Sequence, residues 1–132
     1  LVLAGGCFDI LHPGHVVFLT KAKKAGDILI VLLESDEKVK KLKGLKRPIH
    51  SQKERAKALS LLEAVDYIVL LPYMKYDAEY DELINTIRPD VIAATSGGNV
   101  FHHQRAAKLL GAKLKFVTKT IGNYSTSRIL SS

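Results

Sequence analysis

Short aliphatic segments alternate with helical segments along this chain, and that alternation restricts the possible fold more than any other feature. Leu1 to Ala4 and Ile28 to Leu33 are apolar runs that end at glycine or at polar residues, so both predict buried strands. Between them, Pro13 can occupy a first helical turn and Gly26 closes the segment. These residues therefore predict a strand-helix-strand unit.

The same alternation continues toward the C-terminal end. Ser51-Gln52-Lys53-Glu54 has the Ser-x-x-Glu form of a capping box, which predicts that a helix starts near Ser51. Apolar patterning adds strands over 67–71, 91–94 and 113–117, and helices over 77–87, 104–110 and 125–130. Because parallel neighbours need helical crossovers, this order predicts an α/β fold, a doubly wound parallel five-stranded sheet with helices on both faces.

Length and composition favour a small globular protein. With 132 residues, we expect a single domain over 1–132. No apolar run approaches the ~20 residues of a membrane helix, so no membrane partner is expected. One cysteine, Cys7, cannot form an intrachain disulfide, and a reducing cytoplasm is the expected location.

The formal net charge of +7 favours an anionic partner. Charge alone does not separate nucleic acid from phosphorylated metabolites. Much of the positive charge lies over 38–47, where no aromatic residues are interleaved to stack on bases, so no nucleic-acid partner is expected. A solvated lysine-rich loop is the alternative interpretation of that segment.

The segment from Gly5 to His15 has the composition of a phosphate-binding loop. Its glycines let the backbone approach a phosphate closely, and the free N–H groups of the following helix attract anions. His12 and His15 flank Pro13-Gly14 at that helix start, and both imidazoles can donate hydrogen bonds to phosphate oxygens. Ligands of doubly wound sheets bind beyond the carboxyl ends of the strands, so we expect a triphosphate here.

This segment also carries a family resemblance. Gly6-x-Phe8-Asp9-x-x-His12-x-Gly14-His15 is similar to the signature of the cytidylyltransferase-like nucleotidyltransferase superfamily, whose members share a Rossmann-like fold. Further segments resemble, in order, the adenylyltransferase domain that activates heptose phosphate for lipopolysaccharide core synthesis. These segments are Ser35-Asp36, Leu42-Lys43-Gly44, Arg47-Pro48, Glu54-Arg55, Leu62-Glu63-Ala64-Val65-Asp66 and, near the C-terminal end, Tyr124-Ser125-Thr126-Ser127-Arg128-Ile129.

The resemblance implies a role for each matching residue. Transition-state stabilisation and phosphate binding would fall to His12, His15, Lys43 and Arg55. The nucleotide would be held, through backbone groups, hydroxyls and loop shape, by Gly6, Cys7, Phe8, Asp9, Gly14, Ser125, Thr126 and Ser127. Mg²⁺ would arrive with the triphosphate, and no protein metal cage is expected because magnesium keeps water and phosphate oxygens as ligands.

The expected activity is transfer of AMP from ATP to a phosphorylated small molecule, a heptose-like sugar phosphate, with release of pyrophosphate. ATP is favoured over CTP because the arginine that cytidylyltransferases carry before their Ile-Ser-Thr segment is absent from residues 119–123. The acceptor pocket is expected from residues 75–80 and 96–103. A homodimer is possible, because family members are often dimers.

Four alternatives stay open. One is a CTP:glycerol-3-phosphate cytidylyltransferase, and another is an FMN adenylyltransferase that resembles archaeal FAD synthases. A third is a nucleotide- or RNA-binding module without catalysis. The fourth is a zinc site, because His12 and His15 with His102-His103 supply nitrogen donors, although no cysteine or carboxylate completes a recognisable ligand spacing.

Overall fold

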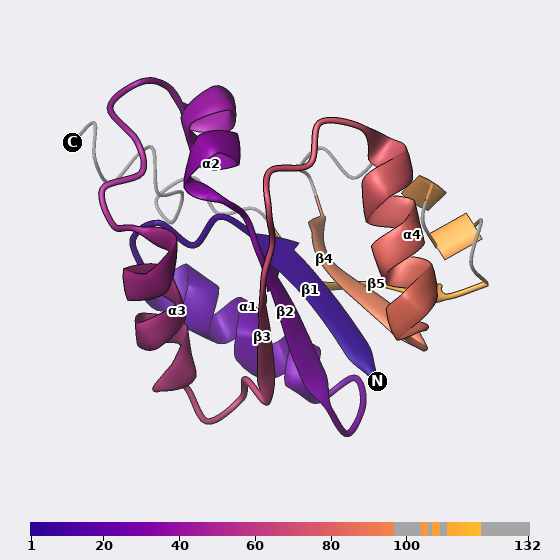
Figure 1. Ribbon diagram of the computed structural model, residues 1–132. Helices are drawn as coiled ribbons and strands as arrows, with labels where there is room; N and C mark the ends of the chain where they lie inside the picture. Colours follow the sequence, from indigo (N-terminus) through magenta and orange to yellow (C-terminus); the bar gives the residue numbers. More distant parts are fainter. Residues whose placement is uncertain (97–103, 106, 109–110, 120–132) are drawn as a thin grey trace.

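One parallel sheet forms the centre of the computed structural model, which describes residues 1–96, 104–105, 107–108 and 111–119 (Figure 1). Its five strands lie in the order β3-β2-β1-β4-β5, and every pair is parallel. The strands are β1 (Val2–Gly6), β2 (Leu29–Leu33), β3 (Tyr67–Leu70), β4 (Val91–Ser96) and β5 (Lys113–Lys119). The predicted five-stranded parallel sheet is confirmed.

Helices cover both faces of the sheet, as the sequence predicts. They are α1 (Pro13–Lys23), α2 (Asp36–Lys43), α3 (Gln52–Ser60) and α4 (Asp77–Ile87). In Figure 1, α1 and α3 lie on one side of the sheet and α4 on the other, while α2 lies beyond the carboxyl ends of β1 and β2. The capping box predicted at Ser51 is present, with Glu54 bonding back to the Ser51 backbone.

Alternating side chains of β1 supply two apolar clusters. Val2 and Ala4 pack in one cluster with Leu19 of α1 and Leu59 of α3. Leu3 points to the other face, where its cluster includes Ile84 of α4. A strand buried on both faces has to be apolar along its whole length, which explains the continuous aliphatic run in the sequence.

The order of the strands places the end of β1 at the point where a ligand is expected. From β1 the chain proceeds to β2 and β3 on one side, and then returns to β4 and β5 on the other. The direction of winding therefore reverses between β1 and β4. The glycines and histidines after β1 lie at this switch point, where doubly wound sheets bind ligands.

The sequence analysis missed helix α2 altogether. The alternative of a lysine-rich loop is wrong for residues 38–43, which are helical. The Ser35 hydroxyl accepts a hydrogen bond of 3.1 Å from the Lys38 N–H, acidic residues occupy the first turn, and lysines occupy the last. The Ser35 cap satisfies a free N–H group of the first turn, and the distribution of charges is favourable to the helix dipole, so both stabilise the helix. Only Val39 of this helix is buried, so apolar periodicity gave no signal.

The other predicted elements are reproduced within a few residues. The helix predicted over 77–87 matches α4, and the described residues of the one predicted over 104–110 are helical. The helix predicted over 125–130 lies outside the described residues, and the single-domain organisation stays a prediction. Across the part of the chain that is described, no helix is both long and apolar enough to cross a bilayer.

We expect Leu59→Ala to lower the free energy of unfolding by about 2–5 kcal/mol, because truncation of a buried leucine leaves a cavity. Leu59 is 0% exposed, whereas Leu61 at the end of the same helix is 82% exposed. Urea denaturation should therefore show a change within about 0.5 kcal/mol for Leu61→Ala. Equal losses for the two variants would contradict the packing of α3 described above.

Candidate active site

The turn that leaves β1 brings Phe8 back under Gly6. Phe8 adopts a left-handed backbone conformation with φ of 46°, and its ring is buried in the cluster beneath α1 and α3. A Cβ atom on Gly6 would lie 2.8 Å from Cε2 of that ring. Gly6 is therefore required by a close contact, and the strained conformation of Phe8 is held in place by core packing.

The two predicted histidines meet at the N-terminus of α1. His12 is the N-cap of the helix, and its Nδ1 accepts a hydrogen bond of 3.1 Å from the Gly14 N–H. The His12 and His15 rings stack, with centroids 3.8 Å apart and planes inclined by 27°. The Phe8 ring meets His15 edge-on at 5.2 Å. Because Nδ1 of His12 accepts, the neutral ring carries its proton on Nε2.

Burial makes these imidazoles neutral donors. It lowers the pKa of His15 to about 4, and the nearby positive charges of His12 and Lys43 act in the same direction. Burial also lowers the pKa of His12. Lys43 is the exposed last residue of α2. The fold brings its charge close enough to lower the pKa of His15, although the two residues are 28 positions apart in the sequence (43 − 15 = 28).

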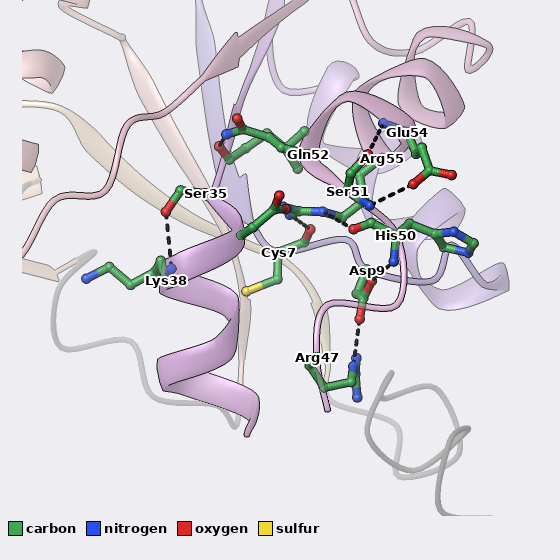
Figure 2. A network of polar contacts seen from close by, with 12 residues as sticks. Cys7, Asp9, Ser35, Lys38, Arg47, His50, Ser51, Gln52, Glu54 and Arg55 are labelled. Atoms are coloured by element: carbon green, nitrogen blue, oxygen red, sulfur yellow. Dashed lines mark hydrogen bonds and ion pairs between the residues drawn. The ribbon is translucent and has the colours of Figure 1, made fainter. Parts of the chain in front are cut away.

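Asp9 fixes the loop between β1 and α1 to the segment before α3. Its carboxylate is 2% exposed and accepts hydrogen bonds from the Arg47 Nε at 2.6 Å and from the backbone N–H groups of Ile49 and His50 (Figure 2). Burial alone would raise the pKa of Asp9, but the hydrogen bonds from His50 and Arg47 outweigh it and keep the pKa below its ordinary value. This geometry supports the predicted orienting role.

Arg55 lies in the interior and connects three segments. The residue is 1% exposed. Its guanidinium donates to the Cys7 carbonyl at 2.7 Å, to the His50 carbonyl at 3.1 Å and to the Asp36 carboxylate at 2.7 Å (Figure 2). Phosphate binding by Arg55 stays a prediction. The observed bonds describe a residue that positions the loop after β1.

Cys7 is held by this arrangement through its backbone. The carbonyl accepts from Arg55, and burial raises the pKa of the thiol, although the positive charge of Lys43 acts against that rise. A raised pKa keeps the thiol protonated at neutral pH, and a protonated thiol is a poor nucleophile. The structure thus agrees with Cys7 as a small packed residue rather than a covalent catalyst.

A cavity of about 300 Å³ opens beside the same loop, on the face of the sheet that α4 covers. Gly6 and Cys7 form part of its wall, and so do Asp77 and Tyr80 from the segment expected to build the acceptor pocket. The sequence did not predict the contribution of Glu34, directly after β2, or of Lys38 and Leu42 of α2. Residues 97–103, expected in the same pocket, lie outside the described residues.

Glu34 and Tyr80 form a hydrogen-bonded pair in the wall of this cavity, which also holds Lys38, Asp77, Asp81 and Arg105. The Tyr80 hydroxyl lies 3.0 Å from each of the two Glu34 carboxylate oxygens. Burial raises the pKa of Glu34, while the Tyr80 hydrogen bond and the charge of Lys38 partly oppose that rise. Burial and the neighbouring Glu34 raise the pKa of Tyr80. Tyr80 therefore keeps its proton at neutral pH and can donate it to Glu34.

Two further predictions concern residues outside the described part of the chain. The predicted phosphate-binding residues Ser125, Thr126 and Ser127 lie outside it, as do His102 and His103 of the zinc alternative. Within the described part of the chain, no three histidine, cysteine or carboxylate side chains gather into a group that could hold a metal ion.

Comparison with known proteins identifies the family. The cytidylyltransferase-like family matches residues 3–129, which is nearly the whole chain. The chain belongs to this family. The match spans every predicted site residue from Gly6 to Ser127, so the family assignment based on the glycine and histidine signature is confirmed.

The most informative relatives share one name. A "Bifunctional protein HldE" from Wolinella succinogenes is 56% identical over 93 residues, which cover 70% of this chain and 19% of that protein. Another from Helicobacter hepaticus is 42% identical over 132 residues, which cover 100% of this chain and 26% of that protein. The chain therefore spans only about a fifth to a quarter of the length of these curated relatives.

A solved structure shares the fold over most of its length. The lipopolysaccharide core biosynthesis protein from Thermoplasma volcanium superposes with a TM-score of 0.69 and 28% identity. The superposition covers 91% of this chain and 94% of that one. The predicted Rossmann-like α/β fold is confirmed.

We expect Arg55→Met to lower the free energy of unfolding by about 3 kcal/mol or more without nucleotide, because hydrogen bonds to a charged group are lost in the interior. Lys53→Met is the matched control, since Lys53 is an exposed cation of the same helix. Urea denaturation measures both. An Arg55→Met protein as stable as wild type, but with weakened ATP binding, would assign Arg55 to phosphate rather than to the loop.

The low pKa of His15 predicts a pH-dependent stability. Between pH 6.5, the ordinary histidine value, and about 4, the unfolded chain binds a proton at His15 and the folded chain does not. This contribution is therefore complete above pH 6.5 and decreases as the pH falls toward 4, by up to about 1.4 kcal/mol per pH unit. Urea denaturation across this range should show a shallower pH dependence for His15→Asn, and an unchanged slope would refute the assignment.

Proposed function

We propose that this chain transfers AMP from ATP to the phosphate of a small sugar phosphate, of the heptose phosphate kind, and releases pyrophosphate. The observation that carries the proposal is the stacked pair His12 and His15 at the N-terminus of α1, at the switch point of the sheet. The names of the relatives support a sugar phosphate acceptor. One solved relative is a lipopolysaccharide core biosynthesis protein, and the curated relatives are bifunctional HldE proteins.

The triphosphate fits at the histidine side of the loop after β1. The positive end of the α1 dipole, the two imidazoles and the Lys43 ammonium all favour negative charge there. The N–H groups of the first turn were expected to be free, but those of Gly14, His15 and Val16 already donate to His12. The outer phosphates would also meet Ser125, Thr126 and Ser127, as the family resemblance predicts.

The proposed reaction is an in-line displacement at the α-phosphorus. An oxygen of the acceptor phosphate forms a bond to that phosphorus, and the bond between the α-phosphorus and the bridging oxygen breaks, so pyrophosphate leaves with the electron pair. The acceptor phosphate is already ionised, so no general base is needed. His12 and His15 donate hydrogen bonds to phosphate oxygens whose charge increases in the transition state.

Magnesium enters this proposal as part of the ATP substrate complex. The carboxylates around the loop are engaged with other groups, since Asp9 accepts from Arg47 and Asp36 accepts from Arg55. These contacts fit a metal ion held by phosphate oxygens and water, which is how Mg²⁺ is usually bound beside a nucleotide. When bound, the ion would neutralise charge on the phosphates.

The choice of ATP rests on the resemblance to heptose phosphate adenylyltransferases and on the absence of the cytidylyltransferase arginine. The choice of a small acceptor agrees with the cavity beside the loop after β1, whose volume of about 300 Å³ lies within the range of small-molecule pockets. The cytoplasmic location and the homodimer stay predictions.

Mixing the protein with MgATP and heptose 1-phosphate should release pyrophosphate, measured with a coupled phosphate assay. CTP in parallel should give a much lower rate, and FMN with ATP should give none. A clear preference for CTP with glycerol 3-phosphate would replace the proposed function by a cytidylyltransferase. No pyrophosphate with any acceptor would leave a binding role.

In the same assay, His15→Ala should lower kcat about 10²–10³-fold, the loss seen when a transition-state donor is removed. Val17→Ala, on the same helix and 47% exposed, is the matched control and should retain wild-type turnover. Equal turnover for His15→Ala and wild type would refute the role of His15.

A further inference from the structure

The cavity beside the loop after β1 is lined by residues that have no role in the proposed phosphate transfer. Its floor is apolar, built from Leu3 and Leu32 of the sheet and Ile84 of α4. It shares only the Gly6–Cys7 edge with the loop that carries the histidines. A ligand could therefore place one end at the histidines and the rest of its body in this cavity.

The polar groups of the cavity come together from distant parts of the chain. Glu34 directly follows β2, and its backbone N–H donates to the Gly6 carbonyl at 3.1 Å, which fixes it beside the loop. Tyr80 belongs to α4, and its hydroxyl lies 3.0 Å from both Glu34 oxygens. The Lys38 ammonium lies 5.2 Å from the centre of the Tyr80 ring, so the phenol is held between a carboxylate and a cation.

This pair accepts more hydrogen bonds than it donates. The single Tyr80 proton is used on Glu34, whereas a carboxylate has about four lone-pair sites and a phenol oxygen also accepts. A ligand that pairs with these sites must bring donors. Hydroxyl groups meet that requirement, and they can lie with their carbon skeleton against the apolar floor.

The same pair disfavours a phosphate in the cavity. The half-buried Glu34 carboxylate would repel a phosphate, and the two other carboxylates of the wall, those of Asp77 and Asp81, act in the same direction. The wall also holds two cations, but Arg105 is paired with Asp81 at 2.8 Å and the Lys38 ammonium lies over the Tyr73 and Tyr80 rings. The phosphate end of an acceptor is therefore directed toward the Gly6–Cys7 edge, close to Lys43 and the histidines. The hydroxyl-bearing end is directed toward Glu34.

We propose that Glu34 and Tyr80 form the acceptor-recognition site, where they accept hydrogen bonds from the hydroxyl groups of the sugar and hold its phosphate toward the histidines. The inference rests on the proposed function for the identity of the acceptor. It adds a specificity-determining pair and a requirement: the acceptor is polyhydroxylated next to its phosphate.

The test compares Glu34→Gln and Tyr80→Phe with wild type, and Tyr67→Phe serves as the control because Tyr67 is 61% exposed at the start of β3. The KM for heptose 1-phosphate should rise roughly tenfold or more in both variants, as expected when a hydrogen bond to a charged group is lost. The kcat value and the affinity for ATP should stay within about twofold, and Tyr67→Phe should behave as wild type.

A deoxy analogue separates recognition from a structural role. Wild type should discriminate heptose 1-phosphate from an analogue that lacks the recognised hydroxyl, and the variants should lose that discrimination. A variant that only loosens the fold would lower kcat/KM equally for both substrates, and that result would overturn the inference. A weaker affinity for ATP instead of the acceptor would also overturn it, because the nucleotide would then occupy the cavity.

Calorimetric binding of heptose 1-phosphate, measured without ATP, keeps this inference separate from the proposed function. If wild type binds the sugar phosphate and Glu34→Gln does not, the site is supported even when no pyrophosphate is released. If wild type and both variants bind it equally, or if none binds it, the inference is wrong. Tyr80→Phe keeps the ring against its neighbours, so it provides a folded variant should Glu34→Gln fail to fold.

Discussion

The buried carboxylate of Asp9 holds the active-site loop to the rest of the molecule. It accepts a charged hydrogen bond from Arg47 and hydrogen bonds from the backbone N–H groups of Ile49 and His50, so the loop after β1 and the segment before α3 form one unit. Arg55 closes the same unit from the other side through the Cys7 and His50 carbonyls. The histidines therefore stand on a rigid base, and pre-organised donors are effective because they need no rearrangement during the reaction.

The two faces of the sheet carry groups of different charge and polarity, and these groups come together at the end of β1. On the α1 side, the helix terminus and the imidazoles favour phosphate charge, whereas on the α4 side a mostly apolar cavity carries the carboxylates of Glu34, Asp77 and Asp81, with Arg105 paired to Asp81. Among the described residues, the two sides meet at Gly6 and Cys7. An acceptor with opposite properties at its two ends would be aligned by this contrast alone, with its phosphate placed for attack.

The degree to which the sequence predicted this structure differs from element to element. The central strands were predictable because they are buried on both faces, and the loop after β1 was predictable because glycines, a proline and two histidines are adjacent in the chain. Helix α2 was not, since it buries only Val39 and is held by its cap and charges. The pairing of Glu34 with Tyr80 was also out of reach, because 46 positions separate them and only the folded chain brings the end of β2 close to α4. Arg55 was found by its place in the family pattern, but its buried hydrogen bonds depend on the fold.

The stacked histidines have a consequence for the end of the proposed reaction. Two rings with centroids 3.8 Å apart resist double protonation, because each added charge opposes the other in a partly buried place. In the proposed reaction the pair would therefore meet the leaving pyrophosphate as dipolar donors rather than as two fixed cations. Such donors stabilise a brief accumulation of charge but retain a free polyanion weakly, so the feature proposed to assist bond cleavage would also allow the product to depart.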